Sequence, residues 1–245
     1  MEQKFDFPTE IIELPSKGLV YDENNPLSSG KIEMKYMTAK EEDILTNQSY
    51  IEKGIVLDKL MQSLIVSKID YNDLILGDKN AIMVAARVLG YGKDYKFTYN
   101  KQEYNIDLSK IENKKIDETL FTKGNNNFLF TLPASGANIT FKILTHGDEK
   151  KIDQELAGIK KINPDASPEL STRLKYTITS VSGKTEQKEI REFIDKYLLA
   201  RDSKALRDYI KSMQPDVDLI FFPDGSAKST TIPIGLDFFW PDINS

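Results

Sequence analysis

The segment Leu14-Pro-Ser-Lys-Gly-Leu-Val-Tyr21, followed by Pro26, Gly30 and the alternating run Lys31–Met37, decides how this chain begins. Proline and glycine at this density exclude a long helix and predict an extended arm with turns over residues 1–30. The arm also carries apolar side chains, which are unusual in a disordered tail. We therefore expect it to pack on its own domain or on a neighbouring protein.

Beyond the arm, apolar and charged residues alternate in Lys31–Met37, which predicts a half-buried strand. Thr38, with Glu41 three positions later, has the pattern of a capping box at the start of a helix. Apolar stripes predict a second helix over residues 53–66 and a third that opens at Asp78 and ends at Gly90 and Gly92.

The rest of the chain alternates between strand and helix patterns. A hairpin with its turn at Asn100–Glu103 and two strands at Asn127–Leu132 and Ala137–Leu144 are predicted. Helices are expected at 148–161, 186–199 and 203–213, with Asp202 capping the last, and strands at 218–222 and 230–234. Residues 170–181 fit helix followed by strand, but their β-branched run leaves the class open.

These patterns predict an α+β fold in which helical groups alternate with small antiparallel β-hairpin regions. We divide the chain into an extended N-terminal arm (1–30), a helical group with a β-hairpin region (31–145), and a second helical group with a C-terminal hairpin and an aromatic tail (146–245).

Composition narrows the class of protein. The 245 residues carry a formal net charge of −5, which argues against nucleic acid as a partner. The absence of cysteine excludes disulfides, thiolate zinc sites and cysteine nucleophiles. No apolar run approaches the roughly 18 residues of a membrane span, and Met1-Glu2-Gln3 does not begin a signal peptide, so we expect synthesis in a cytoplasm and no membrane partner.

Candidate catalytic patterns are weak. His146 is the only histidine, and the chain has no Gly-x-Ser-x-Gly elbow, so His146-Gly147-Asp148 is interpreted as a turn leading into a helix. Gly183-Lys184-Thr185 resembles the end of a phosphate-binding loop, but Ile178 stands where that loop needs glycine. We predict no catalytic residue, cofactor or metal ligand. A hydrolase that uses paired carboxylates stays an alternative, because acidic residues are numerous.

The remaining feature of the sequence is two segments that are suited to contacts with other proteins. The arm offers turn residues and apolar side chains, and the C-terminus carries three adjacent aromatic residues of a kind that often anchors interfaces. The aromatic residues could equally close the core of the chain itself. The candidate interface residues are Pro15, Lys17, Gly18, Tyr21, Phe238, Phe239 and Trp240.

Several stretches together resemble the T-even-type bacteriophage baseplate hub family, over most of the chain. Many members of that family carry Cys-x-x-Cys pairs at two β-turns. The corresponding turns here, Asn100–Glu103 and Pro223–Lys228, have no cysteine, so we expect hairpins without zinc. The matching stretches are Leu14–Tyr21, Pro26-Leu27, Gly30, Met37–Leu45, Gly77–Asn80, Ala85–Arg87, Gly90–Gly92, Arg201-Asp202, Leu206–Ile210, Pro215 and Phe238–Pro241.

The resemblance implies a non-enzymatic structural subunit of a contractile-tail baseplate, located in the virion and assembled in the host cytoplasm. Its expected partners are other baseplate and tail proteins, reached through the arm and the C-terminal tail, and the assembly can hold several copies. The same resemblance also fits a hub assembly factor, or chaperone, that is absent from the finished virion.

Overall fold

The N-terminal arm is one strand of a hairpin. In the computed structural model, which describes residues 8–223 and 229–239, β1 (Thr9–Glu13) pairs antiparallel with β2 (Lys31–Lys35). The connection between them is closed by a hydrogen bond from the Leu14 amide to the Gly30 carbonyl at 2.8 Å. The predicted arm is therefore continuous with the strand that follows it, and the expected boundary at residue 30 falls inside this hairpin.

The turns of this connection lie close together. Gly18 has a φ of +77°, and a Cβ there would lie 2.3 Å from the carbonyl oxygen of Ser28, which belongs to the short 3-10 helix Pro26–Ser29. Only glycine combines that backbone conformation with such a close approach. Glycine at this position thus lets the loop fold back on itself.

The chain forms two lobes, and the hairpin begins the first of them. Four helices follow the hairpin in this first lobe: α1 (Ala39–Leu45), α2 (Gln48–Glu52), α3 (Val56–Leu64) and α4 (Leu76–Tyr91). The capping box is confirmed, because the Thr38 amide donates to the Glu41 carboxylate at 3.0 Å. The helix predicted over 53–66 begins later, at Val56, because Gly54 adopts a φ of +65°. Gly90 lies inside α4, and only Gly92 ends it.

The first lobe also contains the predicted hairpin of β3 (Asp94–Tyr99) and β4 (Gln102–Asp107). Its turn residues Asn100 and Lys101 both have positive φ, as a two-residue hairpin requires. The hairpin is therefore confirmed, with a tighter turn than the four residues expected.

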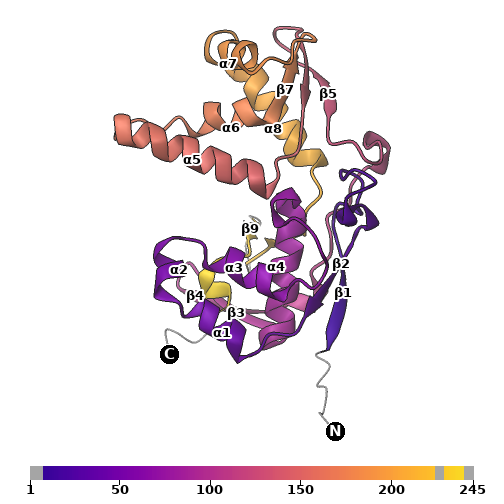
Figure 1. Cartoon of the computed structure of the whole chain (residues 1–245), viewed down its shortest axis with the longest axis vertical. Helices are drawn as coiled ribbons and strands as arrows, with labels where there is room; N and C mark the ends of the chain where they lie inside the picture. The colour runs from indigo at the N-terminus through magenta and orange to yellow at the C-terminus, as the bar shows by residue number, and fades with distance from the viewer. Residues whose placement is uncertain (1–7, 224–228, 240–245) are drawn as a thin grey trace.

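The second lobe is built on a three-stranded antiparallel sheet in the order β5 (Phe128–Thr131), β6 (Asn138–Phe141) and β7 (Ile178–Val181). Its helices are α5 (His146–Ile162), α6 (Glu169–Thr177), α7 (Gln187–Lys196) and α8 (Ala200–Met213). Residues 170–181 prove to be helix up to Thr177 and strand after it. In Figure 1 this lobe lies above the lobe that holds β1–β4 and α1–α4.

The chain then returns to the first lobe. Its last described elements are β8 (Ile220–Phe221), β9 (Thr230–Thr231) and the 3-10 helix Leu236–Phe238. Phe221 packs against the ring of Phe97, and Phe238 against that of Tyr95. The α+β class is confirmed.

The predicted division at residue 145 does not coincide with the lobes. Strands β5 and β6 take their third partner from residues 178–181, beyond that boundary, and residues 215–239 belong with the first lobe. The predicted division follows proximity in the sequence, whereas the two lobes follow strand pairing and aromatic packing. No helix among the described residues has the length and apolar character needed to cross a membrane.

Candidate functional site

A buried carboxylate joins the N-terminal hairpin to the start of α4. Asp78 is fully buried and accepts hydrogen bonds from the amide and hydroxyl of Ser16, at 2.9 and 2.7 Å, and from the Tyr21 hydroxyl at 2.6 Å. The same Tyr21 oxygen accepts from the Ile75 amide at 3.1 Å. Burial raises the pKa of Asp78, although the bonds from Tyr21 and Ser16 oppose that rise. We call Ser16, Tyr21 and Asp78 the buried node.

The segment that returns from the second lobe crosses α4 next to this node. A Cβ on Gly77 would lie 1.9 Å from the carbonyl oxygen of Pro215, on the segment that leaves α8 and returns to the first lobe. Beside it, the Asn80 amide group donates to Asp216 at 3.0 Å. The absence of a side chain at Gly77 is therefore what allows the returning segment to cross α4.

A polar cluster forms a contact between the lobes. His146, the first residue of α5, lies 3.3 Å from Asp58 of α3, and Lys79 of α4 lies 2.7 Å from the same carboxylate. The Tyr71 hydroxyl donates to Asp58 at 3.2 Å. Burial alone would raise the pKa of Asp58, but the hydrogen bonds from His146 and Lys79 outweigh it and hold that pKa well below its ordinary value. The buried His146 side chain thus contacts Asp58 and links the lobes.

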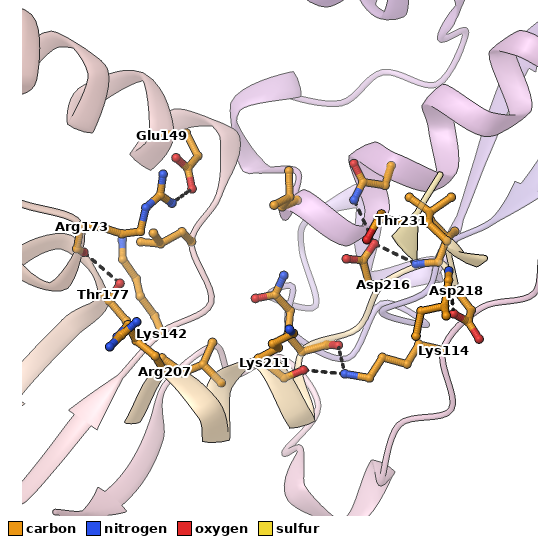
Figure 2. Close-up of a pocket in the computed structure, with 18 of the residues that line it drawn as sticks. Lys114, Lys142, Glu149, Arg173, Thr177, Arg207, Lys211, Asp216, Asp218 and Thr231 are labelled. Atoms are coloured by element: carbon orange, nitrogen blue, oxygen red, sulfur yellow. Dashed lines mark hydrogen bonds and ion pairs between the residues drawn. The ribbon is translucent and has the colours of Figure 1, made fainter. Parts of the chain in front are cut away.

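Between these contacts lies a cavity of about 570 Å³. Figure 2 shows Lys142, Arg173 and Arg207 on one side of it and Asp216 and Asp218 on the other. We call this cavity the inter-lobe cleft. Aliphatic side chains from both lobes line much of it: Leu76, Leu144, Leu170, Leu174, Ile210 and Ile220.

Three of these aliphatic side chains are accessible to solvent. Leu76, Leu170 and Ile220 are 45%, 47% and 58% exposed. Single exposed aliphatic residues are common, but their concentration in one hollow marks a binding surface. The cleft can therefore bury apolar groups of another molecule.

Most charges in the cleft already have partners. Arg173 pairs with Glu149, and Lys142 lies 2.8 Å from Asp148. Lys114 donates to the last carbonyls of α8, at 2.6 Å to that of Lys211, and burial lowers its pKa. These interactions fix the walls of the cleft.

Arg207 and Lys211 differ from these residues. Both are exposed on α8, and neither has an ion-pair partner in the part of the chain that the structure describes. They lie one helical turn apart and so face the same side. Their spacing in the predicted helix 203–213 was visible in the sequence, but nothing there indicated the hollow that they border.

The acidic residues Asp216 and Asp218 of the cleft accept hydrogen bonds from amides. Asp216 accepts from the Val217 amide at 2.8 Å as well as from Asn80, and Asp218 accepts from the Ile220 amide at 3.1 Å. A backbone amide therefore holds each of the two carboxylates in place. Among the described residues, no group of three or more His, Asp or Glu side chains could hold a metal ion.

The predicted interface residues lie mostly inside the fold. Pro15, Gly18 and Tyr21 are buried, whereas Lys17 is exposed and pairs with Glu118 at 2.5 Å. The three residues are buried within the fold of the chain itself: Tyr21 bonds to Asp78 of α4, and Gly18 packs against the Ser28 carbonyl.

The aromatic tail also packs inward. Phe238 and Phe239 are 1% and 0% exposed, so they close the core of the first lobe, which is the second of the two roles considered for them. Trp240 lies outside the described residues.

Comparison with known proteins identifies no relative. No family model, no curated protein and no solved structure matches the chain. The function has to be inferred from the residues of the chain itself.

Proposed function

We propose that the protein is a non-enzymatic structural subunit of a contractile-tail phage baseplate, belonging to its hub, and that it docks onto neighbouring baseplate proteins through the inter-lobe cleft. The observation that carries the docking role is the group of exposed aliphatic side chains, Leu76, Leu170 and Ile220, in one cavity. A surface of that kind suits a protein partner.

The position of the family-like stretches supports the baseplate part of the proposal. Leu14–Tyr21, Gly77–Asn80 and Pro215 are far apart in the sequence, yet they meet at the first turn of α4. These stretches that resemble the family contact one another, so each depends on the others for its place in the fold. This supports the proposal that the chain and the family share an architecture.

The fixed inter-lobe contacts support a structural role. His146 of the second lobe lies 3.3 Å from Asp58 of the first lobe, which Lys79 holds from α4, and Gly77 allows the returning segment to cross α4. A preformed site loses little conformational freedom when a partner binds.

Mass spectrometry of purified particles of the encoding phage tests the proposal. We expect the protein in finished tails at a constant ratio to other baseplate proteins. A protein that is required for assembly but absent from finished particles would instead be a hub assembly factor. A protein that is neither present nor required would overturn both roles.

A further inference from the structure

We propose that the inter-lobe cleft binds a segment of a partner protein in which apolar side chains are flanked by aspartate or glutamate. This inference rests on the proposed docking function and specifies the chemistry of the docked segment. The occupant is identified from the size, the lining and the charge of the cleft.

The size of the cleft favours a short segment. A volume of about 570 Å³ lies within the range of roughly 300–1,000 Å³ typical of ligand pockets. It holds a few side chains, not the flat surface of a folded domain. Because Leu76 belongs to the first lobe and Leu170 to the second, an apolar side chain placed between them would contact both lobes.

The charged residues at the edge of the cleft indicate which residues should flank the apolar side chains of the partner segment. Arg207 and Lys211 form no ion pair among the described residues, although the chain as a whole carries a net charge of −5. They lie beside Ile210, which lines the cavity from the same helix. A carboxylate next to a buried apolar side chain of the partner would therefore meet a cation at the edge of the cleft.

Two other occupants of the cleft were considered, a free anion and a second copy of the chain. Leucine and isoleucine in the lining favour peptide side chains over a free anion such as phosphate, which has no apolar surface to bury. A second copy of this chain carries a net charge of −5 and would also suit Arg207 and Lys211, so a second copy is kept as an outcome of the test.

Selection from a library of random 12-residue peptides displayed on ribosomes provides the test. The full-length protein is the bait, and peptides that also bind Leu170→Asp are removed. We expect the enriched peptides to combine apolar residues with Asp or Glu. In fluorescence anisotropy, the best peptide should bind Leu170→Asp and the double variant Arg207→Glu/Lys211→Glu at least tenfold more weakly.

Matched variants separate the cleft from general surface effects. Ile162→Asp changes an aliphatic residue that is 90% exposed on α5, and Lys160→Glu/Lys161→Glu reverses two exposed charges there; none of these residues lines the cleft. We expect affinities within twofold of the unchanged protein for both, and Arg207→Lys should retain binding. Circular dichroism of each variant verifies that it is folded.

Four results would overturn the inference: no enriched peptide, enriched peptides without acidic residues, equal loss of affinity in the control variants, or a dimer that Arg207→Glu/Lys211→Glu dissociates. The dimer would identify a second copy as the occupant. Incorporation into particles distinguishes the two proposals. Cleft variants that enter particles as well as the unchanged protein would overturn docking through the cleft and the peptide inference but leave the structural role standing. Absence of the unchanged protein from particles would overturn the structural role.

Discussion

Replacing Tyr21 by phenylalanine tests whether the buried node holds the first lobe together. The substitution removes one oxygen atom and keeps the ring. Two hydrogen bonds are lost with it, one donated to Asp78 at 2.6 Å and one accepted from the Ile75 amide at 3.1 Å. Because Asp78 is fully buried, water cannot easily replace the missing hydroxyl.

The size of the effect follows from these two bonds. A hydrogen bond contributes about 0.5–1.5 kcal/mol, and a buried donor left without a partner costs about 1–3 kcal/mol. Since Asp78 keeps both bonds from Ser16, we expect Tyr21→Phe to lower the free energy of unfolding by about 3 kcal/mol. For a chain of this length, that corresponds to a fall in the melting temperature of about 6–12 °C.

Urea unfolding at pH 7, followed by circular dichroism, measures the loss. Tyr36→Phe is the matched control, because the Tyr36 hydroxyl donates to the Glu10 carboxylate at 3.0 Å but at the surface of the protein. We expect a change of at most about 0.5 kcal/mol for this control. If the two substitutions destabilise the protein equally, Tyr21 does not have the structural role assigned to it.

Three further substitutions test the contacts that shape the lobes. Gly77→Ala should lower the free energy of unfolding by about 2 kcal/mol, because the clash with the Pro215 carbonyl exceeds the gain in helix propensity; urea unfolding measures it. Asp58→Asn tests the depressed pKa of Asp58. The ion pair with Lys79 stabilises the fold above about pH 4, the ordinary range of a carboxyl, and this stabilisation is lost as the pH falls through the folded-state pKa. The stability difference from the unchanged protein should therefore be largest at neutral pH and shrink in acid, as urea titrations across pH would show. Phe239→Ala should cost about 3–5 kcal/mol if this ring fills the core, whereas a small loss in thermal unfolding would contradict that role.

Features that depend on neighbouring residues were predictable from the sequence. The capping box of Thr38 and Glu41 was found because its two residues are three positions apart and its hydrogen bonds are local. The hairpin at Asn100 and Lys101 was found because alternating residues on either side of a turn define both strands. The fold class follows from such local patterns, and it was predicted correctly.

Features that depend on distant partners were not predictable in the same way. Asp202 was expected to cap its own helix, but it lies in the first turn of α8 and accepts from the amides of Ala134 and Ser135 at 2.7 and 3.0 Å. A helical pattern shows where a carboxylate lies along the helix, but not which loop approaches it. The pairing of β6 with β7 was not foreseen for the same reason, since a strand pattern does not identify its partner.

The cleft could not be predicted from the sequence for a related reason. Leu170 and Leu174 lie four positions apart in a helix, and this spacing usually indicates a face that packs into the core of the same chain. Leu174 does pack inward, whereas Leu170 is 47% exposed at the cleft. Whether an aliphatic residue closes a core or borders a cavity depends on the second lobe opposite, which no local pattern describes.

The buried node gives the N-terminal segment its organising role. Ser16 reaches Asp78 through both its amide and its hydroxyl, so the backbone must turn immediately after it, and Lys17 and Gly18 make that turn with positive φ angles. Asp78 in turn adjoins Gly77, which contacts Pro215, and the neighbouring residues Leu76 and Asp216 line the cleft. The N-terminal segment, which was expected to be a docking arm, therefore has its role inside the fold. It positions the start of α4, and α4 lines the cleft at which we expect a partner to bind.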